Sequence, residues 1–179
     1  MTARAIGLGA LALFLLSVPF ANWLVQHVGT VCVPAGPCLV PVAPGLLAPS
    51  GVLAVGVALV LRDVVQRYLG AAWALGAIVA GTALSTLVAP PSLVLASGVA
   101  FLLSELADFA VYTPLQRRGL VLAVVASSAV GLVVDSLVFL TLAFGSLDFL
   151  AGQVVGKAWA VGASIPLIRL LHRVGPVDG

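Results

Sequence analysis

The stretch LVLAVVASSAVGLVVDSLVFLTLAF, Leu120–Phe144, is almost entirely apolar and contains one charged side chain, Asp135. A helix needs about 20 residues to cross the hydrocarbon core of a bilayer, which is about 30 Å thick. The stretch is long enough for one crossing. It therefore predicts a transmembrane helix and indicates the class to which the whole chain belongs.

Further stretches of similar length and composition lie along the chain. Segments with the strand-type alternation of a membrane β-barrel are absent. We therefore predict an all-α integral membrane protein with six transmembrane helices in a single domain, residues 1–179. The other predicted spans are approximately Ile6–Val25, Ala48–Arg67, Ala71–Ala89, Ser92–Thr113 and Phe149–Leu171.

The composition of the 179-residue chain agrees with a lipid environment. Apolar residues make up 62% of it and charged residues only 8%, whereas an average soluble domain has about 25% charged residues. So few charges cannot cover a water-facing surface, which excludes a soluble enzyme, a nucleic-acid-binding protein and a disordered chain. The bilayer is thus one expected partner, and nucleic acid is not.

Arginines occur at alternate ends of the predicted spans. The connections 26–47, 145–148 and the Pro90-Pro91 turn contain neither Lys nor Arg. The positive-inside rule places the arginine-rich ends, and with them both termini, in the cytoplasm. We interpret the first span as a retained helix, because Pro19 would stand where cleavage after Ala21 requires a small residue. The arginines are Arg4, Arg62, Arg67, Arg117, Arg118, Arg169 and Arg173.

The connection between the first two spans, residues 26–47, is expected on the outer side. Together with Pro49 it contains Pro34, Pro37, Pro41 and Pro44, so it is not a regular helix, and it is too apolar for a solvated linker. We expect it to fold over the helix ends as a cap. Cys32 and Cys38 lie in this segment on the oxidising side, where they either form a disulfide or remain unpaired.

Four ionisable residues are predicted near the middle of the membrane. A rise of 1.5 Å per residue puts Glu105 and Asp108 about 18 and 13 Å from Arg117, and Asp135 and Lys157 each about 14 Å from Ser146. Charges at such depth are costly and usually line a cavity or find a partner. Because Asp135 and Lys157 have equal depth on antiparallel neighbours, we expect an ion pair, which either lines a cavity or only holds the helices together.

The two acids of the fourth span need a different explanation. Glu105 and Asp108 share one helix face, they repel each other, and Lys157 is the one spare cation at this depth. At least one of them is therefore protonated, solvated by a cavity, or available to the donors of a ligand. Arg62 and Asp63 are expected near the inner end of the second span, with Asp63 paired to Arg67.

Sequence motifs of common enzymes are absent. GQVVGK, Gly152–Lys157, is one residue shorter than a phosphate-binding loop and lacks the Ser or Thr that should follow Lys157. Neither G-x-S-x-G nor H-E-x-x-H occurs. His27 and His172 are predicted at opposite faces of the membrane. We therefore expect neither an enzyme nor a cofactor or metal site.

Motifs along nearly the whole chain resemble the vitamin uptake transporter family. They are ANWLVQ (Ala21–Gln26), LVLRDVVQRYLG (Leu59–Gly70), ASGVAFLLSELADFAVYTPLQRR (Ala96–Arg118), VGLVVDSLVFLTLAFG (Val130–Gly145) and GQVVGKAW (Gly152–Trp159). The resemblance implies a six-helix inner-membrane protein, similar in fold to the substrate-binding subunits of energy-coupling-factor transporters. In the family's queuosine-precursor branch, it implies import of a cyano- or aminomethyl-deazaguanine for salvage of the queuosine base of tRNA.

The resemblance also bears on individual residues. It places Asn22, Asp63, Asp108, Asp135 and Lys157 on polar intramembrane positions of the family, while Glu105 is an acid where an amide is expected in other members. A guanine-like ligand presents adjacent N–H donors that a carboxylate accepts, and aromatic side chains stack on its ring. The aromatic candidates, each of which is otherwise a packing residue, are Phe101, Tyr112, Phe139 and Trp159.

These observations combine into one hypothesis, a carrier with a midplane pocket between the fourth, fifth and sixth spans. Glu105 or Asp108 accepts the N–H edge of the substrate, and the Asp135–Lys157 pair holds the cavity walls or opens to bind. The alternatives are a substrate-binding subunit that needs an ATPase partner and a non-transporting membrane scaffold; small-residue helix faces permit a homodimer. The candidate site residues are Asn22, Asp63, Phe101, Glu105, Asp108, Tyr112, Ser128, Asp135 and Lys157.

Overall fold

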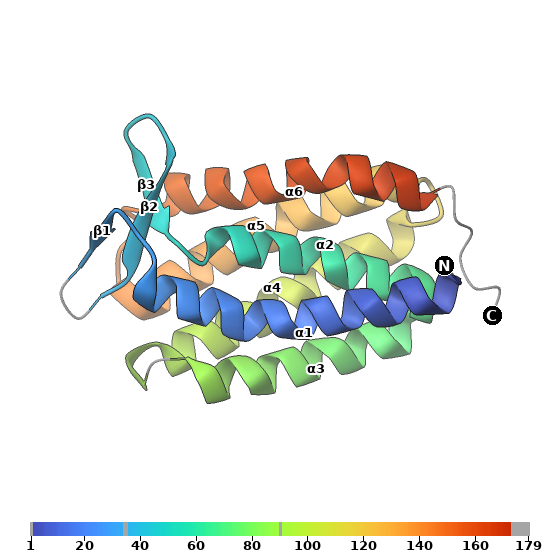
Figure 1. The fold of residues 1–179 in the computed structure, drawn as a ribbon, viewed down its shortest axis with the longest axis horizontal. Helices are drawn as coiled ribbons and strands as arrows, with labels where there is room; N and C mark the ends of the chain where they lie inside the picture. Colours follow the sequence, from blue (N-terminus) through green and yellow to red (C-terminus); the bar gives the residue numbers. More distant parts are fainter. Residues whose placement is uncertain (1, 34–35, 90, 173–179) are drawn as a thin grey trace.

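The computed structural model describes residues 2–33, 36–89 and 91–172. These residues form six long helices that run along a common axis, with a small sheet at one end of the bundle (Figure 1). The start of α1 and the end of α6 lie at the other end, away from the sheet (Figure 1). The helices are α1 (Ala3–His27), α2 (Val52–Leu69), α3 (Ala71–Val88), α4 (Val94–Leu115), α5 (Leu120–Phe144) and α6 (Leu150–His172), with a 3-10 turn at Pro91–Leu93.

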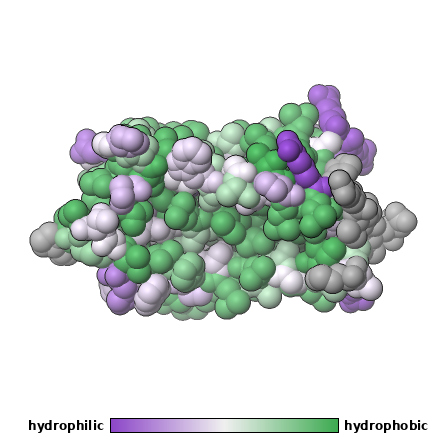
Figure 2. Space-filling view, turned by 45° about the horizontal axis from the view of Figure 1, so that its top comes forward, coloured by the Kyte–Doolittle hydropathy of each residue, from purple (hydrophilic) through white to green (hydrophobic). Residues whose placement is uncertain are grey.

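Among the described residues, five helices are long and apolar enough to cross a membrane, namely α1, α3, α4, α5 and α6. Figure 2 shows hydrophobic residues over the middle of the visible face and the most hydrophilic ones toward its two ends. The chain is therefore a multi-pass membrane protein. The predicted crossing by α2 differs from the others because that helix of 18 residues contains Arg62, Asp63 and Arg67.

The helix boundaries follow the predicted spans closely except at the start of α2. Leu120–Phe144 coincides with α5, but the second span was expected from Ala48, which instead lies in a strand. A single residue, Gly70, separates α2 from α3, and its φ of +93° lies in a region that side chains other than glycine rarely adopt. This conformation lets the chain reverse between two helices without a longer loop.

The segment between α1 and α2 folds into an antiparallel sheet of three strands, β1 (Val31–Cys32), β2 (Cys38–Ala43) and β3 (Leu46–Pro49). The expectation of a non-helical segment is confirmed. The described chain is otherwise helical, which is consistent with the expected all-α membrane protein. Cys32 and Cys38 pair across β1 and β2 and form a disulfide. The sheet thus closes one end of the bundle with a covalently fixed edge.

The sheet rests on α6. The indole N–H of Trp159 donates a hydrogen bond of 3.1 Å to the carbonyl of Val42. A Cβ on Gly152 would overlap the carbonyl oxygen of Leu47, so only glycine permits this close approach. The expected cap is therefore present, and it is anchored to the helix that contributes Lys157.

Helix α2 lies at the centre of the bundle and contacts each of the other five long helices of the described chain. Close approach to two of them depends on glycines. A Cβ on Gly56 would lie 2.7 Å from the Lys157 carbonyl, and one on Gly131 would lie 2.8 Å from the Leu59 side chain. These contacts bring α5 and α6 against the part of α2 that carries Arg62 and Asp63.

Candidate functional site

A cavity lies among the six helices in the half of the bundle nearer the sheet. We call it the outer cavity. Its volume is about 90 Å³. Its walls are mostly apolar, with polar groups at a few points, as is usual for small-molecule sites. The polar residues in its lining are Ser17, Asn22, Ser85, Ser97, Asp135, Gln153 and Lys157.

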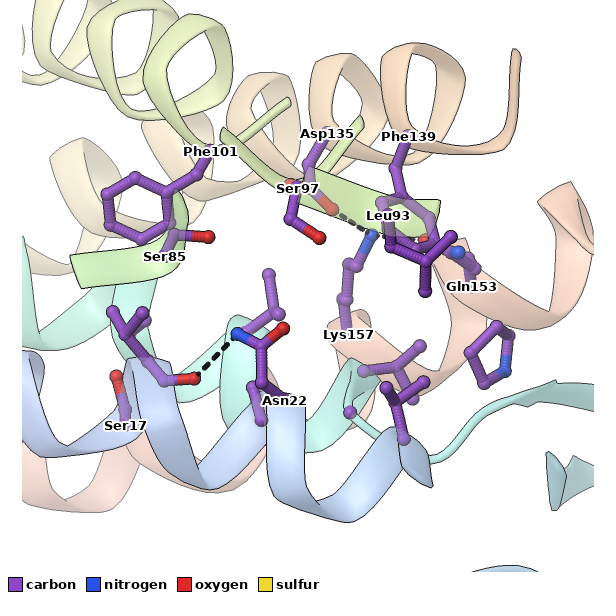
Figure 3. A pocket seen from close by; sticks show the side chains of 18 residues that line it. Ser17, Asn22, Ser85, Leu93, Ser97, Phe101, Asp135, Phe139, Gln153 and Lys157 are labelled. Carbon is purple, nitrogen blue, oxygen red and sulfur yellow. Dashed lines mark hydrogen bonds and ion pairs between the residues drawn. The ribbon is translucent and has the colours of Figure 1, made fainter. Parts of the chain in front are cut away.

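Lys157 reaches from α6 to α5 at the wall of the outer cavity (Figure 3). Its Nζ lies 2.5 Å from Asp135 Oδ2, 2.8 Å from Ser136 Oγ and 2.5 Å from Gln153 Oε1. These contacts use all three N–H donors of the ammonium group. The expected Asp135–Lys157 ion pair is confirmed.

The two members of this pair differ in their exposure. The side chain of Lys157 is 1% exposed and that of Asp135 is 11% exposed. Asp135 Oδ1 makes no hydrogen bond to any described residue. Asp135 therefore offers a free carboxylate oxygen at the cavity, while Lys157 is occupied in holding that carboxylate in place.

The opposite wall comes from α1, α3 and α4. Asn22 Nδ2 donates to the carbonyl of Val18 at 3.0 Å, and its amide points into the cavity in Figure 3. Ser85 and Ser97 make no side-chain hydrogen bond within the described part of the chain, and their hydroxyls point toward the space in Figure 3. The rings of Phe101 and Phe139 stand at opposite sides of that view. The cavity thus combines free donors and acceptors with aromatic faces.

A second polar group lies deeper in the bundle, around Arg62. Arg62 Nε is 3.3 Å from Glu105 Oε2, Nη1 is 3.0 Å from Asp63 Oδ1, and Nη2 contacts Asp108 Oδ1. Nη1 also donates to Gln66 Oε1 at 3.0 Å. We call these five residues the Arg62 cluster. Each of them is at most 3% exposed.

The position of Arg62 corrects the sequence-based expectation. Its side chain does not extend to the membrane interface: it is fully buried on the part of α2 that packs against the other helices. It supplies the cation that Glu105 and Asp108 were expected to lack. Asp63 pairs with Arg62 and accepts a hydrogen bond of 3.0 Å from Ser127, so the expected pairing with Arg67 is wrong.

Aromatic and hydroxyl groups surround the Arg62 cluster. The guanidinium carbon of Arg62 lies 5.6 Å from the centre of the Tyr112 ring and 5.9 Å from that of Phe109. Gln66 Nε2 donates to Thr113 at 2.9 Å. The hydroxyls of Tyr112 and Ser128 are buried and have no hydrogen-bond partner among the described residues.

The predicted site residues therefore fall into two groups. Asn22, Phe101, Asp135 and Lys157 line the outer cavity. The structure brings Asp63, Glu105, Asp108 and Tyr112 together around Arg62, away from the cavity lining, with Ser128 buried on α5.

Several polar residues of these two groups were not among the predicted site residues. Gln153 precedes Lys157 by four residues and so shares its helix face, a spacing that would have identified it. Ser85 and Ser97 have no comparable signal in the sequence. The residues missed are Ser17, Arg62, Gln66, Ser85, Ser97, Ser136 and Gln153.

Comparison with known proteins shows that part of the chain is similar to a transporter family. Residues 85–171 match the model of a family described as "Putative vitamin uptake transporter". The matched segment contains α4, α5 and α6, and thus Glu105, Asp108, Asp135 and Lys157. It supports the vitamin uptake transporter family and, with the apolar helices, a membrane transporter. No curated protein and no solved structure matches the chain.

Proposed function

We propose that this protein is a carrier that binds a small planar molecule in the outer cavity and imports it, with a queuosine precursor such as cyano- or aminomethyl-deazaguanine as the substrate. One observation carries the proposal. The Asp135–Lys157 pair lines a cavity to which all six helices contribute residues, and both residues lie within the segment that matches a transporter family. A buried pair that served packing alone would need no cavity beside it.

The lining suits a heterocycle with both donors and acceptors. Asp135 Oδ1 is free to accept an N–H of the guanine-like edge, and a charge-assisted bond of this kind is stronger than a neutral one. Ser85, Ser97 and Asn22 face the remaining polar atoms of such a ring. Phe101 provides a face for stacking, which contributes about 1–3 kcal/mol per base.

The buried acids lie at two different places, so the carboxylate that we assign to the substrate differs from the one expected from the sequence. Arg62 already engages both Glu105 and Asp108. We therefore assign the N–H edge to Asp135 and give the Arg62 cluster, with Tyr112 and Ser128, a place on the inner side of the binding site. Gln153 holds Lys157 and thereby the orientation of Asp135.

The proposal includes an orientation of the protein in the membrane. We place both termini in the cytoplasm, let α2 cross the membrane as a sixth span in the inner membrane, and put the sheet on the outer side, where it covers the entrance to the cavity. Helix α2 packs against five apolar helices, and this position lowers the cost of placing its three charged residues in the membrane. Rocking of the helices about the cavity then gives alternating access.

Uptake by the purified protein, reconstituted alone in liposomes, tests the function. We expect saturable uptake of radiolabelled cyano-deazaguanine. Asp135→Asn should weaken its binding about 10- to 100-fold, because a bond to a charged group is lost. Asn22→Ala removes a cavity group without disturbing the ion pair and should weaken binding about 2- to 10-fold. Asp148→Asn, at an exposed acid, is the matched control.

Other outcomes would contradict the proposal. Binding without uptake until an ATPase module is added would make the protein a substrate-binding subunit. Failure to bind any deazaguanine or vitamin would favour a membrane scaffold. Unchanged binding by both Asp135→Asn and Asn22→Ala would remove the outer cavity as the site.

A further inference from the structure

We propose that the Arg62 cluster is a proton-binding site, in which Asp63 and Asp108 share one proton, and that this proton is carried inward with the substrate. The coupling step rests on the proposed function, whereas proton binding does not.

The buried acids outnumber the buried bases. Four of the six acidic residues of the chain lie in the interior, namely Asp63, Glu105, Asp108 and Asp135. They face two cations, Arg62 and Lys157. If every acid were ionised, the interior would hold two more negative than positive charges, and uncompensated charge in an apolar medium is strongly unfavourable. One bound proton halves this excess.

The ion pairs of the Arg62 cluster identify where a proton belongs. Asp63 Oδ1 lies 3.0 Å from Arg62 Nη1, and Asp108 Oδ1 contacts Nη2 of the same guanidinium, so the two carboxylates are neighbours. Asp108 Oδ2 is buried and has neither a hydrogen bond nor an ion pair within the described part of the chain. Two carboxylates this close do not both ionise easily, and a proton shared between them gives this oxygen a partner.

Two hydroxyls outside the acid pair point to the same conclusion. Tyr112 and Ser128 are fully buried, on α4 and α5, and neither hydroxyl has a hydrogen-bond partner among the described residues. The Tyr112 ring packs 5.6 Å from the guanidinium carbon of Arg62. Buried hydroxyls are normally satisfied. The Tyr112 hydroxyl is therefore a further unsatisfied polar group on a residue that packs against the Arg62 cluster.

The other groups around the pair come from three helices. Arg62 and Gln66 lie on α2, together with Arg67, whose guanidinium is 5.8 Å from the Tyr68 ring. Glu105 lies on α4, and Ser127 on α5 donates to Asp63. The guanidinium of Arg62 already contacts Asp63, Glu105 and Asp108, so the three acids share one fixed cation.

Helices α2, α4 and α5 contribute to both this site and the outer cavity. Glu105 of α4 is held by Arg62, and Asp135 of α5 lines the cavity. During one cycle an O–H bond forms on the acid pair while the site faces outward. The same bond breaks when the site faces inward, so one proton crosses with each substrate.

Infrared spectroscopy of the reconstituted protein tests proton binding directly. We expect the carbonyl band of a protonated carboxylic acid at neutral pH, which shifts when the protein is labelled with carboxyl-¹³C aspartate but not with labelled glutamate. This measurement needs no variant, so it does not depend on how well a variant folds. Absence of the band at neutral pH, or a shift with labelled glutamate alone, would overturn the proposal.

Variants then locate the proton and test coupling. Asp63→Asn and Asp108→Asn should each abolish the band, while Asp148→Asn should leave it unchanged; a band that survives both cluster variants would refute the assignment.

In liposomes, a gradient of one pH unit, alkaline inside, should raise the accumulation of cyano-deazaguanine up to about tenfold. Gradient-independent uptake would disprove coupling while the proposed function stands. If the infrared band is present but the liposomes show no uptake, the proposed function and the proton coupling are both refuted, and the result supports the proton-binding site alone.

Discussion

Lys157 Nζ on α6 and Asp135 Oδ2 on α5 lie 2.5 Å apart at the wall of the outer cavity, and the ammonium group has no donor left over. The pair joins two neighbouring helices at the level where the cavity separates α1 from α5. It therefore supports the fold and shapes the site at the same time. Stability and binding must be separated before a variant of either residue can be interpreted.

A double substitution separates the two roles. Asp135→Leu alone leaves Lys157 buried without its partner, which should lower the free energy of unfolding by about 3–5 kcal/mol. Adding Lys157→Met removes the stranded charge, and an apolar pair of similar volume should recover most of that loss. Thermal unfolding in detergent measures both changes. Ligand binding should remain lost in the double variant; a double variant as unstable as the single one would refute this account.

Arg62 should be the most sensitive charged position in the chain. Arg62→Met leaves Asp63, Glu105 and Asp108 without a cation, and should destabilise the protein by about 3–5 kcal/mol. Arg62→Lys should recover only part of this, because an ammonium group does not reproduce the planar fork of guanidinium donors. Arg117→Lys, at an exposed arginine, is the matched control for thermal unfolding.

The pH dependence of the Arg62→Met variant has a defined sign. The folded variant must protonate the acids of the Arg62 cluster to remain uncharged, so it holds more protons than the unfolded chain. Its stability therefore decreases as the pH rises and recovers as the pH falls. Unfolding temperatures measured across neutral pH report this directly. A variant that becomes less stable on acidification would show that the cluster acids stay ionised.

The sequence predicted the Asp135–Lys157 pair because equal depth on adjacent antiparallel helices depends only on counting residues. The burial of Arg62 could not be predicted by counting residues. An arginine near a helix end reaches the interface when its helix lies at the edge of a bundle, but α2 lies at the centre. Which helix is central is decided by tertiary packing, and the glycines that permit it, Gly56 and Gly131, are ordinary in sequence.

The sheet could not be predicted from the sequence, because prolines indicate a non-helical segment but also argue against strands. Pro41 is tolerated in β2 because the register is irregular between Pro41 and Ala43, and Pro49 stands at the end of β3. The cysteines could have suggested the pairing of β1 with β2, because Cys32 and Cys38 face each other there. Spacing alone left their oxidation state open.

The disulfide should matter for the sheet more than for the helices. Cys32 and Cys38 are separated by 6 residues, and closing so short a loop contributes only about 2 kcal/mol. We expect a reducing agent, or Cys32→Ser with Cys38→Ser, to increase proteolysis within the sheet while the helical circular dichroism stays unchanged. Cleavage at the same rate with and without reduction would show that contacts with α6 hold the sheet by themselves.

Two glycines of α6 give a matched test of how the sheet is anchored. Gly152→Ala should lower the unfolding temperature and loosen the sheet, because the new methyl group meets the backbone carbonyl of Leu47, which cannot rotate away. At Gly162 a Cβ meets nothing within 4 Å, so Gly162→Ala should stabilise the same helix by up to about 1 kcal/mol through its higher helix propensity. Opposite signs in thermal unfolding would confirm the contact between α6 and the sheet. Equal effects at the two positions would contradict a role for the close contact between Gly152 and Leu47 in anchoring the sheet.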